Sequence, residues 1–170
     1  MKNIFFVFAL VLMLISVDSC GIKTEEEKIK DTVGKLGNFA EERNVDGILS
    51  YIAEDYLDMY SRTKNNLRQL LNSYFRSYRG IVVHILGTRV IEINLPEAQI
   101  ETDVALSSGA GKIFRKLASF YGEYYRIKVK LVKKNSRWVA QEADWKSVNI
   151  EVLFPESLKI LEKILPEALK

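Results

Sequence analysis

Residues 81–106 read IVVHILGTRVIEINLPEAQIETDVAL, and this stretch decides the fold class. Apolar side chains recur within it at every second position, which is the spacing of a β-strand with two different faces. The alternation is cleanest in residues 98–106, where apolar or neutral side chains take turns with acidic ones. We therefore predict two strands, 81–93 and 98–106, joined by a turn at Asn94-Leu95-Pro96, with a bulge or bend at Gly87.

Two further strands are expected downstream, at 120–132 and 137–148. A tight turn at Asn135-Ser136 links them, and the glycine-containing segment 107–111 is expected to form the loop that precedes them. The pattern thus predicts a curved antiparallel sheet of four strands or more.

Upstream of this sheet the apolar period is that of helices. Thr24 followed by Glu27 is a capping-box pattern, and it opens a helix predicted over 25–43. Asn44 is expected to cap a second, short helix, and a third helix is predicted over 63–78.

Pro155 stands at the first position of a last helix, predicted over 156–169. Helices followed by a run of strands indicate the α+β class, with the N-terminal helices packed in the curve of the sheet. We therefore divide this part of the chain into an α+β domain, 25–150, and a C-terminal amphipathic helix, 151–170.

The N-terminal residues are typical of an export signal. Lys2 supplies a positive start, and residues 4–17 form an uncharged apolar run. That run is shorter than the roughly 20 apolar residues that a membrane-spanning helix needs.

The segment Val17-Asp18-Ser19-Cys20 resembles the box that precedes the lipidated cysteine of bacterial lipoproteins, although Asp18 departs from the usual pattern. The resemblance implies that a signal peptide, 1–19, is removed and that Cys20 carries the lipid, with 20–24 as a short linker. The protein is then expected to be a membrane-anchored lipoprotein of the cell envelope, facing the periplasm or the cell exterior. The alternative is an ordinary secretory cut near Ser19 that leaves a free thiol.

Length and composition narrow the class of protein. The chain has 170 residues, a length that suits one domain. Its net charge of +3 is modest and does not argue for nucleic-acid binding. Cys20 is the only cysteine, so no disulfide can form within the chain. His84 is the only histidine, which excludes a histidine pair as a metal site, and we expect neither a metal nor a cofactor.

A row of basic residues marks one face of the strand predicted over 120–132. Arg126, Lys128 and Lys130 share this face. They form either a docking surface for anionic lipid, glycan or protein, or a solvated outer face that discourages pairing between sheet edges.

The order of elements over 25–148 resembles the nuclear-transport-factor-2-like superfamily, also called SnoaL-like or cystatin-like proteins. The resemblance also lies in the segment Asn44-Val45-Asp46-Gly47 leading to Glu54-Asp55-Tyr56-Leu57-Asp58, and in the strand pair that closes on Arg137-Trp138-Val139. It implies a cone in which a curved sheet wraps around the first helix and encloses an apolar pocket. Members include isomerases, dehydratases, small-molecule binders and dimerisation modules, so the fold alone does not fix the function.

Several side chains are candidates for lining such a pocket. Glu123 and Tyr125 are expected on the inward face of their strand, where a partly desolvated carboxylate has a raised pKa; the alternative places Glu123 in water at the open end. The corner before the third helix is either a pocket mouth or a helix-packing corner. The full set of candidates is Tyr56, Asp58, Tyr60, Tyr74, Glu123, Tyr125 and Trp138.

Three functions remain open from the sequence. The first is a non-catalytic, lipid-anchored domain that binds a small apolar ligand or an envelope protein, because no complete catalytic set can be identified. The second is an isomerase, dehydratase or hydrolase with Glu123 or Asp58 as the base. The third is a structural module that forms a homodimer through the open sheet face.

Overall fold

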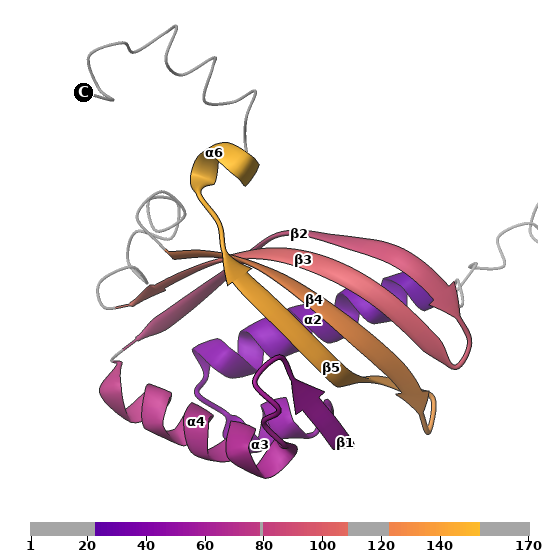
Figure 1. Cartoon of the computed structure of the whole chain (residues 1–170), viewed down its shortest axis with the longest axis horizontal. Coiled ribbons are helices and arrows are strands. Elements are labelled where there is room, and N and C mark those ends of the chain that lie inside the picture. Colours follow the sequence, from indigo (N-terminus) through magenta and orange to yellow (C-terminus); the bar gives the residue numbers. More distant parts are fainter. Residues whose placement is uncertain (1–22, 79, 109–122, 154–170) are drawn as a thin grey trace, which may run out of the picture.

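The structure is a computed structural model that describes residues 23–78, 80–108 and 123–153 (Figure 1). The predicted signal peptide, Cys20 and the helix predicted over 156–169 lie outside these residues. Among the helices of the described part, none is both long enough and apolar enough to cross a membrane.

The described residues form helices first and then a sheet, so the predicted α+β class is confirmed. In chain order the elements are α2 (Glu25–Glu41), α3 (Val45–Leu49), β1 (Ile52–Asp58), α4 (Lys64–Ser77), β2 (Ile81–Asn94), β3 (Glu97–Ser108), β4 (Glu123–Lys134), β5 (Arg137–Ser147) and α6 (Ile150–Leu153).

The helices begin where the sequence predicts. The Thr24 hydroxyl accepts a hydrogen bond from the backbone N–H of Glu27, and the Glu27 carboxylate accepts one from the backbone N–H of Thr24. Asn44 caps α3 by accepting from the N–H of Gly47 at 2.8 Å. These side chains satisfy N–H groups that have no partner inside the helix, which is why each helix starts there.

The sheet is mixed and has five strands in the order β1-β5-β4-β3-β2. The four predicted strands form the antiparallel part, β2 to β5. The fifth strand, β1, is not among the predicted elements, which place only a corner before the third helix. It pairs parallel to β5 and follows no clean alternation of buried and exposed residues.

Two irregularities bend β2. The pairing of β2 with β3 shifts between Ile85 and Gly87 and again between Val90 and Glu92, so the bulge predicted at Gly87 is confirmed. Bulges of this kind increase the local twist of a strand. The sheet curves around α2, which crosses its inner face, and it stays open along the edges β1 and β2 (Figure 1).

The core lies between α2 and the inner face of the sheet. Ile29 and Val33 of α2 pack there against Ile100, Leu131 and Trp138 of the strands. The side chains that alternate with these on the strands point to the opposite face, which we call the outer face. Toward the hairpin turns the outer face is polar, whereas at the opposite end of the sheet its side chains Val82, Ala105 and Tyr124 are buried.

Candidate functional site

Three tyrosines and a glutamate lie near one another where α4 ends and β4 begins, an end of the sheet that we call the wide end. We call this group, Tyr74, Tyr78, Tyr125 and Glu123, the tyrosine cluster. The rings of Tyr74 and Tyr78 lie 4.4 Å apart between centroids, and the Tyr125 hydroxyl donates a hydrogen bond of 2.7 Å to Glu123 Oε2. The cluster therefore presents aromatic faces beside hydroxyl groups and one carboxylate.

Local structure explains how these side chains come together. Tyr74 and Tyr78 are four residues apart at the end of α4, so they lie on one side of the helix. Glu123 and Tyr125 are two residues apart on β4 and share one face of that strand. The Arg43 guanidinium donates hydrogen bonds to the carbonyls of Phe75 and Tyr78, and so fixes the end of α4.

The surroundings keep the hydroxyls of the cluster protonated. The hydrogen bond to Glu123, together with burial, raises the pKa of Tyr125 to about 12. Burial raises the pKa of Tyr74 as well, and the neighbouring Tyr78 and Glu123 add to this shift. At neutral pH both phenols therefore stay protonated. The Tyr125 proton is donated to Glu123, so the Tyr74 hydroxyl is the one that can donate to a ligand.

Asp58 and Tyr60 belong to a different site, the corner between β1 and α4. The Asp58 carboxylate is buried and accepts three hydrogen bonds, from the backbone N–H of Tyr60 at 2.8 Å, the backbone N–H of Arg62 at 3.0 Å and Arg62 Nε at 2.6 Å. Burial raises its pKa, but the hydrogen bonds outweigh burial and the pKa lies below its ordinary value. A carboxylate held in this way is a weak base.

Arg62 and two aromatic rings complete this corner. The Arg62 guanidinium lies 4.8 Å from the centroid of Tyr60 and 5.1 Å from the ring of Trp145. The Tyr60 and Trp145 rings are 5.8 Å apart in an edge-on arrangement. These contacts fix the end of β1 to β5, which is a structural role.

Tyr56 and Trp138 lie in the hydrophobic core. Trp138 is 1% exposed, and its indole N–H donates to Glu25 Oε2 at 2.9 Å. Burial, with a smaller contribution from Asp58, raises the pKa of Tyr56 to about 12. Of the candidates from the sequence, the structure brings together Tyr74, Glu123 and Tyr125. It places Tyr56 and Trp138 in the core and Asp58 and Tyr60 at the corner.

Tyr78 was not among the candidates, although its signal was present in the sequence. It follows Tyr74 by one helical turn, on the apolar stripe that predicts α4. That this stripe lies near the face of β4 that carries Glu123 is a result of the tertiary fold. The periodicity of the sequence predicts each element but not how the two elements meet.

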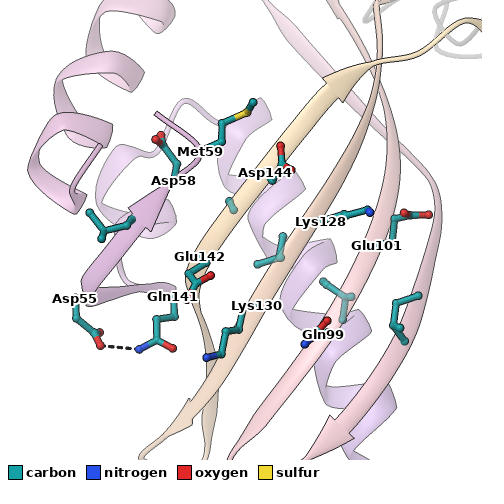
Figure 2. Close-up of a pocket in the computed structure, with 15 residues that line it drawn as sticks. Asp55, Asp58, Met59, Gln99, Glu101, Lys128, Lys130, Gln141, Glu142 and Asp144 are labelled. Carbon is teal, nitrogen blue, oxygen red and sulfur yellow. Dashed lines mark hydrogen bonds between the residues drawn. The ribbon is translucent and has the colours of Figure 1, made fainter. Parts of the chain in front are cut away.

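A groove of about 720 Å³ lies on the outer face, between the end of β1 and strands β3 to β5. Figure 2 shows its side chains, with α2 behind the strands. Most of the lining residues are charged or carry an amide, among them Gln99, Glu101, Lys128, Lys130, Gln141, Glu142 and Asp144. The other lining residues include Leu57, Met59, Ile91 and Val129, so the groove offers apolar contacts as well as polar groups.

The predicted row of basic residues lies along the outer face between acidic rows. Arg126 binds Asp103 through two hydrogen bonds of 2.8 and 3.1 Å. Lys128 stands opposite Glu101 and Asp144 in the strand register. Acidic side chains on the neighbouring strands neutralise this basic row. We therefore interpret the row as part of a solvated outer face rather than as a docking surface for an anionic partner.

Within 23–78, 80–108 and 123–153, no three histidine, cysteine, aspartate or glutamate side chains are grouped so that they could hold a metal ion. The chemistry available to the described residues of the cluster is therefore that of aromatic faces, hydroxyls and one carboxylate.

The sequence matches no protein-family model and no curated protein. The structure, in contrast, is similar to several solved ones. One is a proposed scytalone dehydratase from Novosphingobium aromaticivorans DSM 12444, with a TM-score of 0.62 and 12% identity over 74% of this chain and 85% of that chain. Another is a protein of unknown function with a cystatin-like fold from Nostoc punctiforme PCC 73102, with a TM-score of 0.58 and 15% identity over 74% of this chain and 93% of that chain.

A third similar structure is a proposed dehydratase of the nuclear-transport-factor-2-like family from Streptomyces avermitilis, with a TM-score of 0.60 and 9% identity over 72% of this chain and 95% of that chain. The fold is nuclear-transport-factor-2-like. At these identities the likeness concerns the fold alone, and this fold carries both enzymes and binding proteins. The expected α+β fold, with helices packed in the curve of the sheet, is thus confirmed.

Proposed function

We propose that this protein is a lipoprotein of the bacterial envelope, held at a membrane by lipid on Cys20. Its nuclear-transport-factor-2-like domain binds a small, largely apolar ligand at the tyrosine cluster without converting it. The observation that carries the binding function is the gathering of Tyr74, Tyr78 and Tyr125 around Glu123 at the wide end of the sheet.

Tyrosine side chains suit this task because each offers a large apolar surface with a polar group at its tip. Tyr74 and Tyr125 are partly buried, so a ligand that covers their rings would remove further apolar area from water. The Tyr74 hydroxyl would then be available to orient a polar group of the ligand.

Binding is favoured over catalysis by the state of the two carboxylates that the sequence suggests as bases. Asp58 is saturated with hydrogen bonds and has a lowered pKa, so it attracts a proton poorly. Glu123 is exposed to water, and its Oε2 accepts the hydrogen bond of the Tyr125 hydroxyl. Neither carboxylate therefore has the surroundings of a strong catalytic base.

Native mass spectrometry of the mature protein, purified in detergent from its own host, tests the proposal. We expect extra mass that is present under native conditions and lost on denaturation, which would also give the mass of the ligand. A bare native mass would contradict ligand binding and support a partner protein or an assembly role instead. A multiple of the chain mass would report a homodimer.

Single substitutions locate the site. Tyr74→Phe removes the hydroxyl that is available to the ligand, and we expect an affinity loss of about three- to tenfold, the worth of one hydrogen bond. Tyr60→Phe is the matched control, because Tyr60 is 62% exposed and belongs to the corner rather than to the cluster. Equal losses in both variants, or no loss in either, would place the site elsewhere.

The anchor has its own test. Mass spectrometry of the mature N-terminal peptide should show a diacylglycerol and fatty acyl groups on Cys20. The Cys20→Ser variant should no longer sediment with the membranes and should stay in the soluble part of the envelope fraction. Two or more acyl chains give stable anchoring, which a single chain does not. An unmodified Cys20 would contradict the lipoprotein assignment without affecting ligand binding.

A dehydratase-type enzyme is the second candidate. It is favoured by the names of two similar structures and by the pair of a phenol and a carboxylate, Tyr125 and Glu123. If the protein turns over its ligand, Glu123→Gln should abolish turnover and preserve binding. Bound material that leaves the protein chemically unchanged would exclude this candidate.

A further inference from the structure

We infer that the end of the sheet where its hairpins turn faces the bilayer, while the tyrosine cluster opens away from the membrane toward water. We call the first region the hairpin end; it comprises the β2–β3 turn, the β4–β5 turn and the start of α2. This inference rests on the lipid anchor proposed above. It specifies which surface of the domain faces the lipid and from which side a ligand enters.

The linker between anchor and domain is short. Cys20 and Lys23, the first residue that the structure describes, are separated by three steps along the chain, which span at most about 11 Å when fully extended. Lys23 and Thr24 lead directly into α2, where Thr24 forms the capping box. Lys23 therefore stays within about 11 Å of the lipidated residue, and Glu25, the first residue of α2, within about 18 Å.

The start of α2 is fixed to the hairpins. Glu25 accepts hydrogen bonds from Trp138 Nε1 at 2.9 Å and binds Lys133 Nζ at 2.8 Å. Lys133 and Trp138 are register partners next to the β4–β5 turn. The backbone N–H of Lys133 also donates to the carbonyl of Pro96, in the β2–β3 turn, at 2.8 Å. Helix start and both turns therefore move as one unit.

The tyrosine cluster lies at the other end of the same strand. Tyr125 precedes Lys133 by eight residues on β4, which is roughly 26 Å at a rise of about 3.3 Å per residue. This distance is more than twice the reach of the linker. Figure 1 shows the same separation: the start of α2 and the hairpin turns lie on one side of the view, and the end of α4 on the other.

Most charges at the hairpin end are paired, and Arg137 beside the β4–β5 turn lies 5.1 Å from the centroid of the Tyr51 ring, so this end can approach a lipid surface without strong repulsion. Its lysines have acidic partners nearby. The pairs are Lys23 with Asp31, Lys28 with Glu25, Lys30 with Glu26, Lys130 with Glu97 and Lys134 with Asp55. The anchor therefore holds this end at the membrane, and binding should depend little on anionic lipid.

This orientation constrains the ligand. A cluster that opens roughly 26 Å beyond the hairpin end receives molecules from the aqueous phase of the envelope rather than from the acyl region of its own bilayer. The ligand class that fits is a small apolar molecule with enough solubility to diffuse through water.

Site-specific fluorescence quenching on vesicles tests the orientation. The lipid blocks the thiol of Cys20, the only cysteine, so one introduced cysteine in the full-length mature protein can be labelled uniquely. Leu95→Cys labels the β2–β3 turn, where Leu95 is 62% exposed; Ser77→Cys labels the end of α4, and Gln69→Cys labels its exposed side. The vesicles contain phosphatidylcholine with a quencher on the headgroup.

We expect the label at position 95 to lose most of its fluorescence, while labels at 77 and 69 keep theirs. Stronger quenching at 77 than at 95 would mean the inverted orientation, and strong quenching at 69 would mean that the domain lies flat on α4; either result overturns the inference. An unchanged urea midpoint for each labelled variant shows that the label has not disturbed the fold.

Two further readouts separate this inference from the anchor itself. Flotation with vesicles and the mass of the N-terminal peptide report whether the protein is acylated and bound. Protein that carries no acyl groups and does not float overturns the anchor and this inference together. Protein that is acylated and floats, but shows the wrong quenching order, overturns the orientation alone.

Discussion

The two ends of β4 differ in how their polar groups are used. At the hairpin end, Glu25 binds Trp138, Lys133 and Lys28, and Trp138 is almost fully buried. At the wide end, Glu123 is exposed, and among the residues that the structure describes it accepts a hydrogen bond from Tyr125. One end has its polar groups satisfied within the fold, and the other leaves aromatic and polar groups partly in water.

This difference separates stability from binding. Groups whose hydrogen bonds are complete inside the protein stabilise the fold and have little left to offer a ligand. Groups that remain partly solvated contribute less to stability but can exchange water for a ligand. The comparison therefore predicts large stability effects at the hairpin end and at the Asp58 corner, and small ones in the tyrosine cluster.

Trp138→Ala should have the largest effect on stability. It removes a core side chain that packs against α2 and leaves Glu25 without its indole donor. We expect a loss of about 3–5 kcal/mol in the free energy of unfolding, measured by urea denaturation. Trp138→Phe keeps most of the volume and should lose less. A loss below about 1 kcal/mol for the alanine variant would contradict the packed hairpin end.

Asp58→Ala comes next. It leaves Arg62 and two backbone N–H groups without their acceptor in a buried corner, and we expect a loss of about 3 kcal/mol. Because the folded-state pKa of Asp58 lies below its ordinary 3.8, its stabilisation is present above that pH and disappears as the pH falls below it. The urea midpoints of wild type and variant should therefore converge in strong acid. A difference between the two midpoints that stays constant with pH would contradict a stabilising role for the charge of Asp58.

Glu25→Gln tests the charge at the hairpin end. Hydrogen bonds from Lys133 and Lys28, opposed by partial desolvation and helped by Trp138, lower the pKa of Glu25 from 4.5 to about 2. The stabilisation from its charge is therefore full above pH 4.5 and is lost as the pH falls toward 2. The wild type should be the more stable protein at pH 6, and the difference should vanish near pH 2. Glu26→Gln, one residue along, is the matched control for a change of net charge.

Local signals made much of the fold predictable from the sequence. The capping box at Thr24, the cap at Asn44 and the turn at Asn135-Ser136 each depend on residues close in the chain, and each is present in the structure. Strand β1 was missed because its partner, β5, lies more than 80 residues away and because Glu54 and Asp55 interrupt its alternation.

The candidate site was less predictable because it depends on how distant elements meet. Tyr56, Asp58 and Tyr60 alternate along one segment, yet the structure places Tyr56 in the core and the other two at a corner. Tyr74 and Tyr125 come near each other only in the tertiary fold, so neither the helical period of one segment nor the strand period of the other predicts their meeting. Residue type and strand face can therefore propose candidates, while tertiary contacts decide which of them share a site.

Glu123→Gln should have the smallest effect on stability and a specific effect on one tyrosine. Glu123 is exposed, so the free energy of unfolding should change by no more than about 0.5 kcal/mol. The hydrogen bond to Glu123 is the main cause of the raised pKa of Tyr125, so the substitution should lower that pKa from about 12 toward 10.

Titration of phenolate absorbance measures this shift, with Tyr125→Phe identifying the signal. Tyr56 is the internal control, because its pKa of about 12 arises from burial and from Asp58, which the substitution leaves in place. A Tyr125 pKa that stays at 12 would mean that burial rather than Glu123 sets it, and the wide end would then resemble the packed hairpin end instead of differing from it.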